Sequence, residues 1–261
     1  TSGFIGRVGD DPFGALMQRT LLTEGVDITY LKQDEWHRTS TVLVDLNDQG
    51  ERSFTFMVRP SADLFLETTD LPCWRHGEWL HLCSIALSAE PSRTSAFTAM
   101  TAIRHAGGFV SFDPNIREDL WQDEHLLRLC LRQALQLADV VKLSEEEWRL
   151  ISGKTQNDRD ICALAKEYEI AMLLVTKGAE GVVVCYRGQV HHFAGMSVNC
   201  VDSTGAGDAF VAGLLTGLSS TGLSTDEREM RQIIDLAQRC GALAVTAKGA
   251  MTALPCRQEL E

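Results

Sequence analysis

Strand-like and helix-like segments alternate along most of this chain, and that alternation limits the folds open to it. A strand-like run at 109–113, for example, precedes a helical run at 126–137. Strands that alternate with helices form parallel sheets with helices on both faces. We therefore expect an α/β fold with a mostly parallel central sheet. The expected strands are 4–8, 79–83, 109–113, 140–143, 172–176, 181–186 and 189–193, the last continuing toward 201.

Helical patterns occupy the intervals between these runs. Asp11 and Pro12 are typical of a helix start, as N-cap and first-turn residue, and Gly25 is typical of its end. The expected helices are 12–23, 92–105, 126–137, two short ones from 145 and from 158, 209–218 and 226–245.

One stretch lacks helices. Residues 28–32, 39–46 and 53–58 are β-rich, and residues 47–50 resemble a hairpin turn. Their alternation suits a sheet with one buried face, so we expect a small antiparallel sheet at roughly 28–58 that projects as a lid and brings two copies together as a homodimer. Otherwise residues 1–261 are expected to form a single domain.

Composition narrows the class of partner. The 261 residues carry a net charge of −12, which argues against nucleic acid or an anionic membrane as the main partner. The sequence contains no run of about 18 apolar residues, so it predicts no membrane-spanning helix. The eight cysteines include no C-x-x-C pair, so neither a zinc site nor a disulfide framework is indicated. We expect a cytoplasmic protein whose cysteines are mostly reduced, packed thiols.

The segment from Asp202 to Asp208, D-S-T-G-A-G-D, carries the clearest chemical signal. It lies between a β-like stretch and an apolar helical run. Gly205, Ala206 and Gly207 let the backbone approach a bulky anion, and a helix that starts here directs free N–H groups at it. Asp208 adds a carboxylate at the same helix start. An anion hole beside one carboxylate suits phosphoryl transfer to a hydroxyl, with Asp208 accepting the proton. An ordinary capped glycine turn is the alternative.

Polar residues also follow two expected strands. Asp113 and Asn115 could organise a metal-bound water and a phosphate, and Arg117 could pair with a phosphate or sugar oxygen. A proline turn with a surface arginine explains the same residues. Glu147 lies three residues after Ser144, at capping-box spacing, and could also hold a magnesium-bound water.

Two glycine-containing segments could border a nucleotide. Thr176, Gly178 and Gly181 end one strand and permit close approach, although a plain hairpin turn explains them equally well. Gly249 follows the last helix, where it is either a C-cap or part of a cation or adenine site. Lys142, at a neighbouring strand end, is a further candidate for nucleotide binding.

Taken together, these motifs resemble the ribokinase-type (PfkB) carbohydrate kinases. D-S-T-G-A-G-D-A-F matches the long C-terminal signature of that family, and D-P-N-I-R, T-K-G-A-E-G and V-T-A-K-G-A occur in the family order. Within the family the chain looks most similar to bacterial fructokinases of sucrose utilisation. The related aminoimidazole riboside kinases end in a segment similar to T-A-K-G-A-M-T-A-L-P.

The resemblance implies a three-layer sandwich with a β lid and an ATP-dependent sugar kinase that uses Mg²⁺. By the same resemblance Asp208 is the base, residues 205–207 form the anion hole, and K⁺ is a further cofactor. The residues implied around that monovalent cation are Asp202, Thr204, Ala244, Ala247 and Gly249.

The chain departs from the family pattern at two places. The family often has N-x-x-E where this chain has Ser144 to Glu147. Family members also usually begin with an Asp-bearing strand and a di-glycine segment that bind the sugar, and we expect that segment to precede Thr1. An aminoimidazole riboside kinase or another sugar or nucleoside kinase of the family stays an alternative, as does a catalytically silent nucleotide- or sugar-binding protein. A nicotinamide-dependent oxidoreductase is disfavoured, because no G-x-G-x-x-G follows an early strand.

Overall fold

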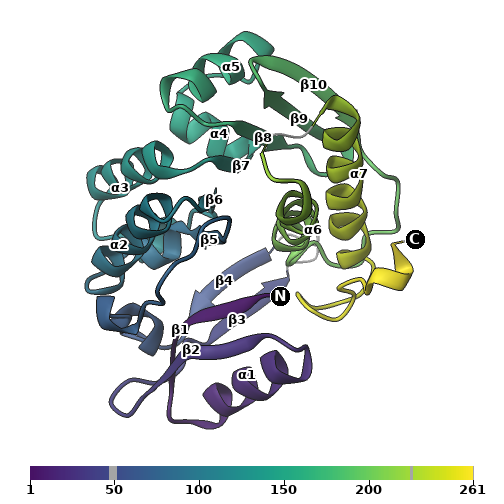
Figure 1. Ribbon diagram of the computed structural model, residues 1–261. Helices are drawn as coiled ribbons and strands as arrows, with labels where there is room; N and C mark the ends of the chain where they lie inside the picture. The colour runs from purple at the N-terminus through teal and green to yellow at the C-terminus, as the bar shows by residue number, and fades with distance from the viewer. Residues whose placement is uncertain (47–51, 224–225, 261) are drawn as a thin grey trace. The chain divides into compact units, whose positions relative to one another are not determined.

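The computed structural model describes residues 1–46, 52–223 and 226–260. The chain divides into two compact units. The first unit contains Thr1–His76, Leu80–Val110 and Asn115–Leu137, and the second contains Gly77–Trp79, Ser111–Pro114 and Ala138–Glu261. Figure 1 labels the elements of both units along the chain.

The main sheet has six strands in the order β10-β9-β8-β7-β6-β5. They are β5 (Trp79–Cys83), β6 (Phe109–Asp113), β7 (Val140–Ser144), β8 (Met172–Thr176), β9 (Gly181–Tyr186) and β10 (Gln189–Ala194). β6, β7 and β8 run parallel, and β9 and β10 close the sheet as an antiparallel meander. The expected α/β class is confirmed, whereas the expected continuation of β10 toward residue 201 is wrong. Ala194 pairs with Gly181, the first residue of β9, so the ladder has no further partner there.

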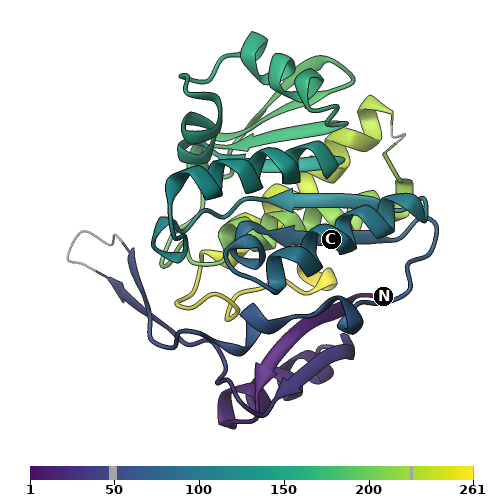
Figure 2. The same cartoon turned by 90° about the vertical axis from the view of Figure 1, so that its left-hand side faces the viewer.

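Helices cover both faces of the strands in the second unit. The strand residues Val182, Val184 and Tyr186 alternate along β9, and all three pack against α6 (Ala206–Thr221) and α7 (Glu227–Ala244). On the other side α4 (Glu145–Ser152) contacts β7 and β8, and α5 (Asp158–Glu167) contacts β8, β9 and β10. Figures 1 and 2 show these helices on either side of the strands. The expected three-layer arrangement follows from this period-2 alternation. α6 is longer than the expected 209–218.

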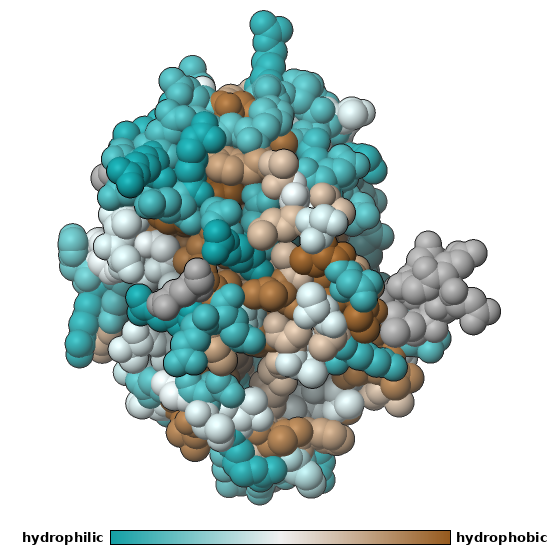
Figure 3. Space-filling view, turned by 90° about the vertical axis from the view of Figure 1, so that its right-hand side faces the viewer, coloured by the Kyte–Doolittle hydropathy of each residue, from teal (hydrophilic) through white to brown (hydrophobic). Residues whose placement is uncertain are grey.

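α7 shows how one sequence pattern makes a covering helix. Met230, Ile233 and Ile234 are buried on one stripe, while Glu227 and Arg231 form an exposed ion pair of 2.9 Å on the other. Figure 3 shows the hydrophilic outer surface over this part of the second unit. Within the described part of the chain, no helix combines the length and the apolar character needed to cross a membrane.

The first unit contains two small sheets. β1 (Gly3–Gly9) pairs in parallel with β2 (Asp27–Asp34), and α1 (Pro12–Thr23) connects them. Asp11 caps α1 as expected, accepting hydrogen bonds from the Phe13 and Gly14 N–H groups. α2 (Ser92–His105) and α3 (Glu124–Leu137) complete the longer helices, and α3 starts two residues earlier than expected.

The β-rich stretch is only partly as expected. β3 (Val42–Leu46) and β4 (Arg52–Phe56) form an antiparallel pair outside the main sheet, and Figure 2 shows them extending away from β1 and β2. The strand expected at 28–32 does not join that pair. It is β2, and the crossover through α1 returns it beside β1 in the same direction. The turn expected at 47–50 lies outside the described residues.

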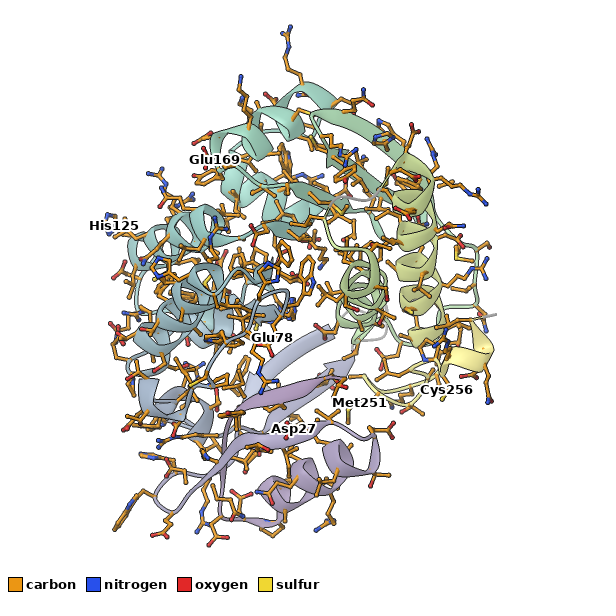
Figure 4. All side chains as sticks on the ribbon, viewed as in Figure 1. Asp27, Glu78, His125, Glu169, Met251 and Cys256 are labelled. Carbon is orange, nitrogen blue, oxygen red and sulfur yellow. The ribbon has the colours of Figure 1, made fainter. Side chains whose placement is uncertain are left out.

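Short 3₁₀ turns complete the fold, at Ala62–Phe65, Thr68–Asp70, Ser84–Leu87, Glu118–Leu120, Gly178–Glu180 and Arg257–Glu259. All eight cysteines are free, but Cys73, Cys200 and Cys256 are exposed rather than packed. Cys256 and Met251 both lie on the segment that follows α7 (Figure 4).

α6 and α7 approach closely at Gly213, where a Cβ atom would lie 2.8 Å from the Cα of Ala237 and 2.9 Å from the Cys240 Sγ. We expect Gly213→Val to lower the free energy of unfolding by about 1–3 kcal/mol, because overpacking would push the two helices apart. Ala212→Val, on the exposed neighbouring position, is the matched control and should change it by less than about 1 kcal/mol. Urea denaturation would measure both, and equal effects would contradict close packing as the cause.

Candidate active site

The start of α6 is shaped by a glycine in the left-handed region. Gly205 has φ +81°, and a Cβ atom there would lie 2.6 Å from the Ala250 carbonyl oxygen. Both the conformation and the close approach exclude a side chain. Gly207 lies inside the helix without a positive φ. Its constraint is crowding, because a Cβ atom there would lie 3.1 Å from the Lys142 Nζ.

The first turn of α6 has two N–H groups that could bind an anion. The Ala206 N–H donates to the Ser203 carbonyl over 3.3 Å, and the Ala209 N–H donates to the Gly205 carbonyl over 2.9 Å. Among the residues that the structure describes, no acceptor faces the N–H groups of Gly207 and Asp208. These two donors and the positive end of the helix dipole favour a negative group here. The Asp208 side chain is exposed on the same turn.

A buried ion pair lies against this turn. The Asp113 Oδ2 at the end of β6 is 2.9 Å from the Lys142 Nζ on β7, and both residues are nearly inaccessible to solvent. The Asp113 Oδ1 is buried and has no hydrogen-bond partner within the described parts of the chain. An ion pair removed from water needs such close geometry to offset its desolvation.

Several of the predicted residues affect the pKa of Asp113. Burial raises the pKa of the Asp113 carboxyl from 3.8 to about 6, and the Lys142 ammonium opposes that rise. The carboxylates of Glu147 and Asp208 raise this pKa further, so both lie close enough to repel the Asp113 charge. Sequence reasoning chose these four residues one by one, and the fold brings them together with Gly207.

Glu147 has a structural task in addition to its place in this cluster. It is buried on α4, and its Oε2 accepts a hydrogen bond from the Ser144 N–H over 2.8 Å. The Ser144 Oγ accepts in return from the Glu147 N–H over 3.2 Å. The capping box expected from the sequence is confirmed.

A second cluster stabilises the approach to α6. The Asp202 Oδ1 accepts hydrogen bonds from the N–H and the hydroxyl of Thr204, over 2.9 and 2.6 Å. The Asp202 Oδ2 accepts from the Gly249 N–H over 2.9 Å. The Val245 carbonyl accepts from the N–H groups of residues 201 and 202. Asp202 therefore links the turn before α6 to the segment after α7.

The three residues expected to border a nucleotide lie around the end of β8. Thr176 is the last residue of β8, and its hydroxyl donates to the Leu143 carbonyl over 3.2 Å. Gly178 has φ +55°, and no heavy atom would meet a Cβ atom there within 4 Å, so this edge is open. Gly181 has a structural reason to be glycine, because a Cβ atom would clash with the Phe193 carbonyl of β10.

The donor groups differ in how well they fit metal ions. In the described residues no group of three or more His, Cys, Asp or Glu side chains could hold a metal. The unpartnered Asp113 Oδ1 beside Glu147 fits a hydrated Mg²⁺, which makes few direct protein contacts. The Asp202 carboxylate and the Thr204 hydroxyl place oxygen atoms together, which fits a monovalent cation, whereas Gly249 meets Asp202 through its N–H group.

Some predicted residues are not brought into either cluster. Asn115, with φ +43°, and Arg117 belong to the first unit, so their roles toward phosphate stay predictions. The Ala244 side chain packs against Ala209 and Cys240, which leaves only its carbonyl for a cation. Ala247 is half-buried on the turn after α7.

Sequence reasoning missed two features of the site. It did not pair Asp113 with Lys142, although both were singled out at the carboxyl ends of neighbouring parallel strands, which signals proximity. The resemblance placed Asp202 and Gly249 around one cation, but it did not anticipate the direct hydrogen bond between them, which joins residues 47 positions apart. The Asp-x-Thr spacing would have predicted only the local half of that network.

Comparison with known proteins shows the family of this chain. The pfkB family carbohydrate kinase model matches residues 1–257. The chain belongs to the pfkB family of carbohydrate kinases. It is 59% identical to a fructokinase of Klebsiella pneumoniae over 260 residues, covering 100% of this chain and 85% of that protein.

Two further relatives show how the similarity varies within the family. A fructokinase from Vibrio cholerae O395, solved as a double mutant with fructose, ADP and a potassium ion bound, has a TM-score of 0.93 and 49% identity, covering 99% of this chain and 83% of that one. An aminoimidazole riboside kinase of Salmonella typhimurium is 37% identical, over 99% of this chain and 80% of that protein. The expected family and ribokinase-like fold are confirmed.

Lowering the pH through about 6 should reduce kcat/KM, because protonation of Asp113 removes the charge that holds the Lys142 ammonium. In Asp113→Asn this step should disappear, and activity at pH 8 should fall roughly 10-fold or more through loss of a charge-assisted hydrogen bond. Rate profiles from pH 5 to 8 would test this, with Asp235→Asn on the exposed face of α7 as control.

Protonation of Asp113 should not unfold the protein, so the loss of kcat/KM below about pH 6 should not result from unfolding caused by this carboxyl. Folding raises the pKa of Asp113 above 3.8, so between about pH 6 and 4 this carboxyl makes the folded state more stable as the pH falls. An activity loss that coincides with loss of circular dichroism signal, or one that persists in Asp113→Asn, would contradict the assignment.

Proposed function

We propose that this chain is an ATP-dependent fructokinase that transfers the γ-phosphoryl group of ATP to a hydroxyl of D-fructose, giving fructose 6-phosphate and ADP. One observation carries the proposal: the exposed Asp208 carboxylate shares the first turn of α6 with N–H groups that lack an acceptor in the described structure. A base and an anion site on one turn are what phosphoryl transfer to an alcohol needs. The fructokinase relatives support fructose over other sugars.

In this mechanism Asp208 accepts the proton of the attacking hydroxyl. It lies on the same turn as residues 205–207, which we assign as the anion hole, and the N–H groups of Gly207 and Asp208 are the donors there that have no acceptor in the described structure. The hydroxyl and the phosphoryl group would therefore meet at one helix end. The N–H groups and the helix dipole stabilise the charge on the transferring phosphoryl oxygens. The absence of a side chain at Gly207 lets the Lys142 ammonium lie close to this turn.

Lys142 supplies a second positive element. Its ammonium lies against the first turn of α6 and is held there by Asp113. In a buried setting such a charge acts more strongly on a phosphate than it would in water. We assign Lys142 to the nucleotide phosphates and Asp113 to the position of Lys142, with Asn115 and Arg117 as further candidates for phosphate or sugar contacts.

The nucleotide is assigned to the edge formed by Thr176, Gly178 and Gly181, with Gly249 on the adenine side. Glu147 and Asp113 would hold Mg²⁺ through water, and the ion would neutralise phosphate charge. Asp202, Thr204 and carbonyls of residues 244, 247 and 249 would hold K⁺, an ion also present in the Vibrio cholerae fructokinase structure. A cytoplasmic location, where ATP is supplied, fits this activity.

The substrate assignment is tested by ADP release from the purified full-length protein with a panel of acceptors. We expect fructose to raise ADP formation above the sugar-free rate far more than ribose does. Aminoimidazole riboside is the informative competitor, because its kinases are the more distant relatives. A clear preference for the riboside would redirect the substrate, and ADP release independent of any sugar would refute the kinase.

Asp208→Asn should lower kcat by roughly 10²-fold or more, the range for loss of a general base. ATP affinity should change little, because the carboxylate is assigned to the acceptor hydroxyl. Asp235→Asn is the matched control, with the same chemical change at an exposed position of α7. Steady-state kinetics and nucleotide titration would separate the two effects. A near-normal kcat in the Asn variant would exclude Asp208 as the base.

We further propose that β3 and β4 form a lid through which two copies dimerise. Val42, Leu43 and Val44 on β3 and Met57, the residue after β4, are all exposed, so this strand pair offers apolar surface for a partner. Leu43→Glu should produce a monomer at micromolar concentration in analytical ultracentrifugation, since it would bury an unpaired charge. Leu129→Glu on α3 starts from a similarly exposed leucine and should leave the dimer intact. A wild-type monomer would refute the dimer.

A further inference from the structure

Two cysteines that the catalytic proposal does not use meet inside the second unit. The Cys162 Sγ on α5 and the Cys185 Sγ on β9 are 2.7 Å apart. Both are free thiols. Sulfur atoms in a disulfide are about 2.05 Å apart, so this pair needs only a small approach to form the bond.

The fold explains why these two thiols face one another. Alternation along β9 directs Val182, Val184 and Tyr186 toward α6 and α7. Cys185 lies between Val184 and Tyr186, so it points to the opposite face, which α5 covers. On α5 the buried residues Ile161 and Leu164 face the sheet, and Cys162 lies beside them with partial exposure.

We propose that Cys162 and Cys185 are an oxidation site that closes into a disulfide and joins α5 to β9. With hydrogen peroxide as the oxidant, the Cys162 thiolate attacks one peroxide oxygen, giving a sulfenic acid and, after proton transfer, water. The Cys185 sulfur then attacks the Cys162 sulfur and loses its proton, the S–O bond breaks, and a second water leaves. In total two thiols and one peroxide give one disulfide and two waters.

The environments of the two sulfurs decide the order of these steps. Burial raises the pKa of Cys185 to about 12, with the hydrogen bond to Cys162 adding to the rise. A thiol that rarely ionises is a poor first nucleophile. Cys162 is the more accessible of the two, so it reacts first, and Cys185 resolves the intermediate without leaving its place.

The bond would link positions 23 residues apart and leave the catalytic turn untouched. Cys185 is the fifth residue of β9, whereas the nucleotide-bordering Gly181 is the first. Closure therefore restricts the unfolded chain without altering the groups assigned to phosphoryl transfer. The measurable consequence is a higher thermal midpoint, by roughly 5 °C, in the oxidised protein.

Mass spectrometry identifies the bond directly. The whole chain is oxidised with stoichiometric peroxide, blocked with N-ethylmaleimide and digested with trypsin without reductant. Cleavage after Arg159, Lys166, Lys177 and Arg187 places Cys162 in peptide 160–166 and Cys185 in peptide 178–187. We expect these two peptides to be cross-linked and to separate on reduction.

Matched variants complete the test. Cys162→Ser and Cys185→Ala should lose both the cross-link and the thermal gain, while Cys200→Ser, which removes an exposed thiol, should keep both. If Cys185→Ala fails to fold, Cys162→Ser still tests whether the cross-link needs this pair, because Cys162 is partly exposed and its substitution disturbs the core less. Oxidised wild type should keep kcat within about two-fold. The proposal is overturned if the cross-link forms only after unfolding in urea, or if it forms without raising the thermal midpoint.

Discussion

The hydrogen bonds of the Asp202 carboxylate are the constraint on which the site depends. They bind the Thr204 turn at one oxygen and the Gly249 N–H at the other. This holds the segment after α7 beside Gly205, whose missing side chain permits the Ala250 carbonyl to approach. That contact fixes the orientation of the first turn of α6. It therefore also fixes the position of the free N–H groups and of Asp208 on that turn.

A buried charge pair sets the electrostatics around the same turn. Asp113 and Lys142 come from neighbouring parallel strands, and their ammonium–carboxylate contact lies where a side chain at Gly207 would intrude. One oxygen of Asp113 is left without a partner in the described structure, and the pKa of that carboxyl is raised by burial. An incompletely satisfied buried group of this kind costs stability, which is typical of residues retained for a ligand rather than for packing.

The two layers of helices differ in what they contribute. α6 and α7 bury the apolar side of β7, β8 and β9, and the first turn of α6 carries Asp208, the proposed base. α5 covers the other side, where it brings Cys162 onto Cys185. The same alternation along β9 thus supplies core residues to one layer and a reactive pair to the other.

The sequence by itself determined most of the elements and the glycine-containing turn at the start of α6. The bounds of α2, β6, β8 and β9 follow from local periodicity, and D-S-T-G-A-G-D at a strand-to-helix junction predicts an anion site with a base, because both signals are local in the chain. Only the tertiary structure decided that β2 pairs with β1, that Asp113 holds Lys142, and that Asp202 reaches Gly249. These contacts join residues far apart in sequence, and their energies depend on burial and on strand register, which a local pattern does not encode.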